Sequence, residues 1–245
     1  MNISLAAEPI FHIGSFPVTN TLLTAWIAMA VLILLAALLR RSLADVPKGL
    51  QNVAEAILEA ILGLMDSVTG DRAKSRKYLP LIATIFLFIV TANWLGLLPG
   101  VGSVGMRETV DGATTFIPYL RSTNSDLNVT IALAIISVLS IQVFGIAAVG
   151  VIRYSQRFLN FSNPIMTFVG VIELVSEAAK LVSFSFRLFG NIFAGEVLLI
   201  VVAGLIPIAA PVPFYFLEVF VGFIQAFVFA ILTLVFIQVA TVETH

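Results

Sequence analysis

Long apolar runs alternate with short polar segments along this chain, and the pattern predicts an integral membrane protein. A helix needs ~20 predominantly apolar residues to cross a bilayer, and five runs have about that length or more. We expect membrane helices at residues 21–39, 78–98, 127–152, 165–206 and 214–242. The predicted fold class is therefore all-α, with about five membrane helices.

Residues 44–68 follow a different pattern. Apolar residues recur there at helical spacing, and charged residues separate them: Asp45, Lys48, Glu55, Glu59 and Asp66. This pattern predicts one amphipathic helix that lies on the membrane surface. A helix packed inside a soluble loop domain is the alternative interpretation.

The composition agrees with a membrane protein and excludes several kinds of site. Hydrophobic residues make up 60% of the 245 residues and charged residues only 11%, well under the ~25% of a soluble domain. The net charge of −1 gives no basic field for nucleic acid. Cysteine is absent and only His12 and His245 are histidines, so we expect no metal and no cofactor.

Basic residues predict the orientation. The segment 40–77 holds seven of them and 153–163 holds two more, whereas the longer segment 99–126 balances its two with acids. The positive-inside rule therefore places 40–77 and 153–163 in the cytoplasm. The N-terminus is then outside and the C-terminus is cytoplasmic.

Charged residues inside the last two apolar segments are the candidates for function. There are six of them: Glu173, Glu177, Lys180, Arg187, Glu196 and Glu218. A charge at the bilayer centre costs ~2.5–3.5 kcal/mol on insertion scales, so these side chains must face protein or water. Such residues are functional candidates by default.

A helical wheel places five polar residues of one segment on a single stripe: Glu173, Glu177, Lys180, Arg187 and Asn191. Glu177 and Lys180 are three residues apart, and Glu173 is two turns from Lys180, so these three can neutralise one another. A buried structural ion pair is the alternative to a functional role for them.

Arg187 has no acidic residue three or four positions away. Because a guanidinium does not lose its proton, its counter-charge must come from another helix or another chain. The small residues Ser183, Gly190 and Ala194 share its face, and they allow a partner helix to approach closely. This pattern favours an external carboxylate, and a static internal pair with Glu196 or Glu218 is the alternative.

Glu196 and Glu218 lie near the same end of the last two helices, where we expect them to line one pocket open to the exterior. Gln225 shares a helix face with Glu218, and Glu173 lies at the opposite, cytoplasmic end. Two hydrated pockets separated by an arginine indicate an ion path in two separate halves rather than a continuous pore.

Four sequence segments carry a resemblance to a known family. The run from Leu181 to Glu196, LVSFSFRLFGNIFAGE, resembles the signature of subunit a of F-type ATP synthase, and Gln225-Ala-Phe-Val-Phe is similar to the family's second motif. The segment from Asn93 to Gly100 and the Asp126-Leu-Asn128 start of the third membrane helix are also similar. The resemblance covers essentially the whole chain.

This resemblance implies a mechanism. The two long helices would form a tilted, nearly horizontal hairpin against a ring of c subunits, and protons would reach the ring carboxylates through two offset half-channels. Arg187 would drive deprotonation and block a leak, with Asn191, Gln225 and Ser183 nearby. Glu196 and Glu218 would belong to the outer half-channel and Glu173 to the cytoplasmic one. Glu177 and Lys180 are further candidates for the proton path.

The sequence departs from the family pattern at some of these candidate residues. Many relatives have histidine where Glu218 stands, and mitochondrial forms have histidine where Glu196 stands. Lys180-Leu181 replaces a basic–proline pair.

By the same resemblance the chain is a stator subunit without a catalytic site of its own. Its partners would be the c-ring, b-type peripheral-stalk subunits, the rest of the ATP synthase and the lipid bilayer. Its location would be the bacterial inner (plasma) membrane, with an energy-transducing organelle membrane as the alternative. We treat the chain as one domain, with N-terminal helices in 1–163 and the ion-translocating hairpin in 164–245.

Two other classes of function are weighed against this one. A secondary transporter would use Arg187 for an anionic substrate, but such folds usually have repeated halves and no repeat is visible. A purely structural membrane subunit does not explain six charges in apolar segments. Whether the coupling ion is a proton or sodium depends mainly on the surroundings of the ring carboxylate. We expect protons.

Overall fold

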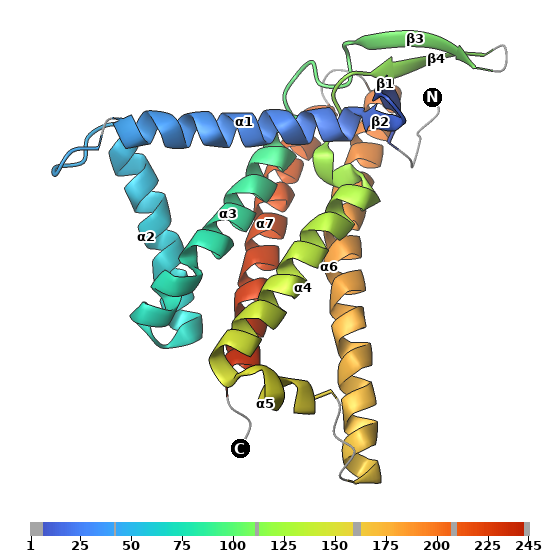
Figure 1. Ribbon diagram of the computed structural model, residues 1–245. Helices are drawn as coiled ribbons and strands as arrows, with labels where there is room; N and C mark the ends of the chain where they lie inside the picture. The colour runs from blue at the N-terminus through green and yellow to red at the C-terminus, as the bar shows by residue number, and fades with distance from the viewer. Residues whose placement is uncertain (1–6, 42, 111–112, 159–162, 207–209, 243–245) are drawn as a thin grey trace.

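The computed structural model describes residues 7–41, 43–110, 113–158, 163–206 and 210–242 (Figure 1). The helices are α1 Asn20–Arg41, α2 Leu50–Thr69, α3 Arg72–Gly96, α4 Leu127–Val149, α5 Val151–Gln156, α6 Pro164–Leu205 and α7 Pro211–Thr241. Within the described ranges, α1, α3, α4, α6 and α7 are long and apolar enough to cross a membrane. The prediction of an all-α membrane fold with five membrane helices is therefore confirmed.

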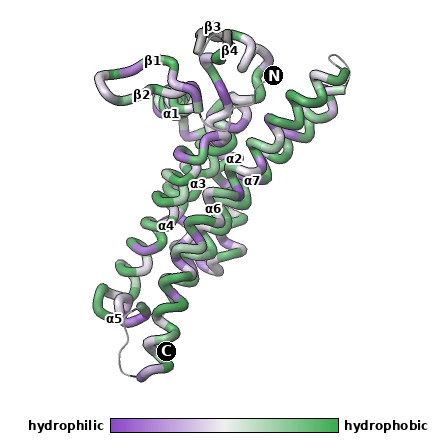
Figure 2. The backbone as a smooth tube through the Cα atoms, turned by 90° about the vertical axis from the view of Figure 1, so that its right-hand side faces the viewer, coloured by the Kyte–Doolittle hydropathy of each residue, from purple (hydrophilic) through white to green (hydrophobic). Residues whose placement is uncertain are grey.

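Helices α3, α4, α6 and α7 lie side by side and share one core, while α1 lies across their upper ends (Figure 1). Fully buried residues of the core include Ile89 of α3, Ile141 of α4, Leu188 of α6 and Leu234 of α7. Figure 2 shows hydrophobic residues along most of the length of the long helices. The bundle therefore presents apolar side chains both to its own core and to its surroundings.

Helix α2 begins at Leu50 rather than at residue 44, because the preceding segment is held in a loop. Gly49 has a φ of 57°, which favours glycine and interrupts a helix. The Gln51 side chain pairs with the backbone of Ala44, accepting from its N–H at 3.0 Å and donating to its carbonyl at 2.9 Å. The amphipathic helix itself is present, and its position on the membrane surface stays a prediction.

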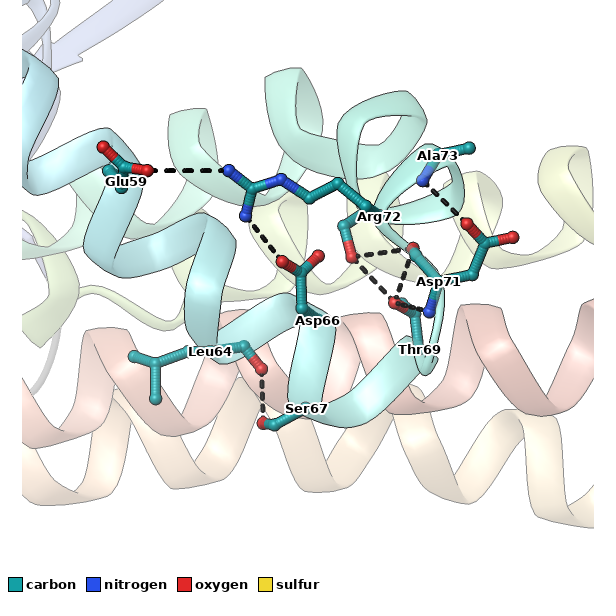
Figure 3. A network of polar contacts seen from close by, with 9 residues as sticks. Glu59, Leu64, Asp66, Ser67, Thr69, Asp71, Arg72 and Ala73 are labelled. Atoms are coloured by element: carbon teal, nitrogen blue, oxygen red, sulfur yellow. Dashed lines mark hydrogen bonds and ion pairs between the residues drawn. The ribbon is translucent and has the colours of Figure 1, made fainter.

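The turn between α2 and α3 explains why α3 begins six residues before the predicted start (Figure 3). Asp71 is the N-cap of α3, and its carboxylate accepts a hydrogen bond from the Ala73 N–H at 2.8 Å. Arg72 pairs with Asp66 and lies 3.7 Å from Glu59. Hydrogen bonding from Ser75 and the nearby Arg72 guanidinium lower the pKa of Asp66. These polar contacts extend the helix beyond its apolar part.

Helix α4 ends earlier than predicted. Gly150 has a φ of 90° and separates α4 from the short helix α5. The apolar run 127–152 continues through this glycine, so hydrophobicity alone does not reveal the break. The prediction that one helix continues to residue 152 is wrong, because α4 ends three residues earlier, at Val149.

Two hairpins lie outside the predicted helices, one before α1 and one in the segment 99–126. Strands β1 (Pro9–Ile13) and β2 (Phe16–Thr19) form one, with Gly14 at φ 63° in the turn. Strands β3 (Gly105–Val110) and β4 (Ala113–Pro118) form the other, in register from Gly105 opposite Pro118 to Val110 opposite Ala113. Short two-stranded hairpins have too little hydrophobic alternation to stand out beside long apolar runs.

Candidate functional site

Arg187 lies in the middle third of α6 and is partly exposed. Its guanidinium donates a hydrogen bond to the Ser183 Oγ at 3.3 Å, and its backbone carbonyl accepts one from the Asn191 amide at 3.0 Å. Among the described residues, no carboxylate forms an ion pair with Arg187. The static internal pair with Glu196 or Glu218 is therefore not formed within this part of the chain.

The face around Arg187 is open. Ser183 and Ala194 are exposed, and a Cβ added at Gly190 would meet no atom within 4 Å. A pocket of about 280 Å³ lies beside them, lined by Lys180, Ser183, Arg187 and residues of α7 that include Phe236. The described residues therefore do not cover the face of small side chains that the sequence predicted around Arg187.

The acidic end of the stripe is paired, but not entirely as predicted. Lys180 Nζ lies 2.6 Å from a carboxylate oxygen of Glu177 and 4.8 Å from the centre of the Phe236 ring. Glu173 instead pairs with Arg157, at 2.9 Å. The expected trio is therefore a pair, because α5 brings an arginine from another segment to Glu173.

Glu196 and Glu218 line one pocket of about 310 Å³, which lies among α3, α6, α7 and the segment before α4. Gly195 makes this possible, because a Cβ there would overlap the carboxylate of Glu218. Gln225 is seven residues further along α7, and among the described residues it has no hydrogen bond. The pocket expected from these two carboxylates is present, whereas Gln225 does not line it.

Arg121, one of the two basic residues of segment 99–126, is 7% exposed and lines this pocket. Its Nε lies 2.9 Å from a carboxylate oxygen of Glu196. Glu8, which precedes β1, is close enough for electrostatic interaction with both. The pKa of Glu8 is raised above its usual value, mainly by burial; the Arg121 guanidinium lowers it and the Glu196 carboxylate raises it further. Arg121 therefore interacts with two acids, Glu196 and Glu8, and Glu218 is a further acid in the same pocket.

Buried polar groups continue the pocket wall. Asn93 donates to the carbonyl of Gly222 at 2.9 Å and accepts from Asn124 at 2.7 Å. Of the seven buried side-chain oxygens without a hydrogen-bond partner among the described residues, four belong to Glu196 and the segment before α4: Ser122 Oγ, Thr123 Oγ1, Asn124 Oδ1 and one Glu196 oxygen. Buried polar atoms of this kind usually bind ordered water.

At the other end of the bundle, Tyr154 of α5 is buried and donates a hydrogen bond to the side-chain oxygen of Gln142 at 2.6 Å. Burial raises the pKa of Tyr154, as do Glu177 and Glu173 to a lesser extent, while Arg157 lowers it. Sequence reasoning missed Tyr154, Arg157 and Arg121, because each comes from a segment between membrane helices whose path the hydrophobic pattern does not predict.

Within the described ranges, no group of three or more His, Asp or Glu side chains is placed to hold a metal ion.

Comparison with known proteins identifies the family. The sequence model of the family described as ATP synthase A chain matches residues 22–238. ATP synthase subunit a of Moorella thermoacetica is 36% identical over 228 residues, covering 93% of each chain. That of Campylobacter jejuni subsp. doylei is 38% identical over 95% of this chain and 89% of its own, and that of Campylobacter fetus is 35% identical over 98% and 97%. The chain therefore belongs to the ATP synthase A chain family, whose members include these ATP synthase a subunits.

Proposed function

We propose that this proton-translocating subunit carries protons through two offset half-channels, with Arg187 between them. The outer half-channel is the pocket of Glu196 and Glu218, and the cytoplasmic one runs past Glu173, Glu177 and Lys180. Ser183, Asn191 and Gln225 lie along the route between them. A ring carboxylate on c subunits would collect the proton from one side and release it to the other.

One observation carries this proposal: Arg187 is the charge on α6 that has no oppositely charged partner among the described residues. Glu173, Glu177, Lys180 and Glu196 all form ion pairs. Since a guanidinium keeps its proton, Arg187 on an open face requires a carboxylate from outside the chain. A passing carboxylate becomes anionic beside it, because an adjacent positive charge favours the ionised form.

The buried oxygens without partners around Ser122, Thr123 and Asn124 support a hydrated outer pocket. Such hydration would let protons reach the carboxylates from outside. Among the described residues, no comparable cluster lies beside Arg187, so the two half-channels would remain separate there.

The partners and orientation follow from the same proposal. Subunit a associates with the rest of the ATP synthase, and the open face of α6 fits the c-ring, while b-type stalk subunits would contact other exposed apolar helices. The multi-pass chain would lie in the bacterial inner membrane with its N-terminus outside and its C-terminus cytoplasmic. Residues 164–245 would form the translocating hairpin.

Replacing Arg187 by Ala tests this function. In inverted vesicles that contain the whole ATP synthase, we expect the loss of ATP-driven proton pumping and the appearance of a passive proton leak. ATP hydrolysis should continue, because the nucleotide sites are on other subunits. Pumping is followed with a pH-sensitive dye and hydrolysis by phosphate release.

Arg107→Ala is the matched control, because Arg107 is an exposed arginine on β3, away from α6. It removes the same charge and should keep pumping near the wild-type level. Coupled pumping by the Arg187→Ala enzyme would overturn the role proposed for Arg187.

A further inference from the structure

The two carboxylates of the outer pocket differ in their surroundings. Glu196 is bound to Arg121, whose guanidinium is 7% exposed and keeps its proton. Loss of either side chain would break a largely buried ion pair, which is strongly unfavourable. Glu196 is thus held in the pocket wall by its contact with Arg121.

The position of Arg121 is fixed by its neighbours rather than by Glu196 alone. Its backbone N–H donates to the Thr24 hydroxyl of α1 at 3.3 Å. The segment that follows it ends at Asp126, which accepts a hydrogen bond from Thr21 of α1 at 2.8 Å and caps α4. These contacts hold the backbone at Arg121 in place, and its guanidinium in turn holds Glu196 in the pocket wall.

Glu218 lines the same pocket in the opposite condition. Its side chain is 6% exposed, and among the described residues it has neither an ion pair nor a hydrogen bond. Its carboxylate packs against Gly195, where any larger residue would overlap it. A carboxyl group without a structural partner gains and loses a proton without breaking a contact of the fold.

Glu218 is also the better placed of the two for transfer toward Arg187. It shares a face of α7 with Gln225, two turns further into the bundle. Between them, the Gly222 carbonyl is bonded to Asn93, which continues the polar wall.

We propose that Glu218 is the proton-carrying acid of the outer pocket, and that Glu196 and Arg121 form a fixed ion pair that positions its wall. The division of roles rests on the proposed function of the pocket. It assigns Arg121 to the translocation machinery as a positioning residue, and it distinguishes two acids that sequence alone treats as equivalent.

The test compares Glu218→Gln with Glu196→Gln, Arg121→Gln and the double variant Arg121→Gln/Glu196→Gln in the whole ATP synthase. We expect Glu218→Gln to lower ATP-driven pumping at least tenfold. Each single change at the pair should also lower it, because each removes one half of the Arg121–Glu196 ion pair and leaves the other half without it. The double variant, which removes both charges, should recover at least threefold over Glu196→Gln.

Rescue by another titratable group gives a second measurement. Glu218→His restores a protonatable side chain and should pump better than Glu218→Gln, whereas Glu196→His should gain nothing over Glu196→Gln. Purification of each variant complex reports whether the subunit is assembled. The histidine comparison at Glu218 decides the matter if the double variant does not assemble.

Two results would overturn the division of roles: a double variant as inactive as Glu218→Gln, or rescue by histidine at position 196 rather than 218. These outcomes are distinct from failure of the proposed function. If Arg187→Ala abolishes pumping while Glu218→Gln does not, only the assignment of Glu218 fails.

Discussion

At the scale of single residues, the cost of charge inside an apolar segment explains most of the ion pairs. Glu177 and Lys180 are three residues apart on α6, and their side chains are mostly buried. The ammonium of Lys180 also lies over the Phe236 ring. Sequence spacing predicted this pair, because its geometry is a property of one helix.

Removal of one partner should therefore cost more than removal of both. We expect Glu177→Gln to lower the free energy of unfolding by about 3 kcal/mol, the low end for a broken buried pair. The double variant Glu177→Gln/Lys180→Met should lose less, because no charge is left alone. Unfolding of the chain in detergent micelles, followed by the fluorescence of Trp26 and Trp94, measures both. A double variant less stable than the single one would contradict this.

Partners that come from other segments were beyond prediction from spacing. Arg157 reaches Glu173, and Arg121 reaches Glu196, only because the loops between helices fold back onto α6. Hydrophobic patterns give the positions of apolar helices but not the path of a polar connection. The charges that needed a partner were identified, whereas the identity of that partner required the fold.

At the scale of elements, long apolar helices were predicted closely and short ones were missed. The last two helices begin at Pro164 and Pro211, close to the predicted starts, because proline suits the first turn of a helix. Helix α5 was hidden, since its first two residues, Val151 and Ile152, continue the apolar run of α4 and the rest of the helix is too short and polar to stand out. Its position depends on a tertiary contact, in which the Tyr154 ring fits against Gly145 of α4.

Gly145→Ala should displace this ring, because the new Cβ would overlap it. Overpacking of this kind typically costs about 1–3 kcal/mol. We expect a loss of stability in that range and faster hydrogen exchange in residues 151–156, measured by mass spectrometry. Gly204→Ala is the control, because a Cβ at Gly204 meets no atom within 4 Å. Equal effects of the two changes would show that Tyr154 does not need the glycine.

At the scale of the whole molecule, helix length decides how the bundle lies in the bilayer. Helix α1 has 22 residues, about 33 Å at 1.5 Å per residue, which matches an upright crossing of ~30 Å of hydrocarbon. Helix α6 has 42 residues, or about 63 Å. Both ends of α6 expose apolar side chains, Ile165 and Leu205, so neither end belongs in water. Helix α1 also lies across the bundle (Figure 1).

An upright α1 and an α6 tilted by about 60° from the membrane normal satisfy both lengths, since 30 Å is about half of 63 Å. Because the chain has no cysteine, Ile165→Cys and Leu205→Cys each give it a single site for a spin label, and the cysteines of the other subunits are replaced. In nanodiscs that hold the whole ATP synthase, we expect both labels to be relaxed by lipid-soluble oxygen more than by a water-soluble nickel complex. Ser15→Cys, in the exposed turn between β1 and β2, should show the reverse. An upright α6 would leave about 30 Å of the helix outside the hydrocarbon, and one of the two labels would then respond like Ser15→Cys. At this tilt Glu173 and Glu196, which are 23 residues apart, would differ in depth by only about 17 Å, with Arg187 between them. Each acid would then lie several ångströms inside the hydrocarbon, so each would need a hydrated pocket to exchange protons with water.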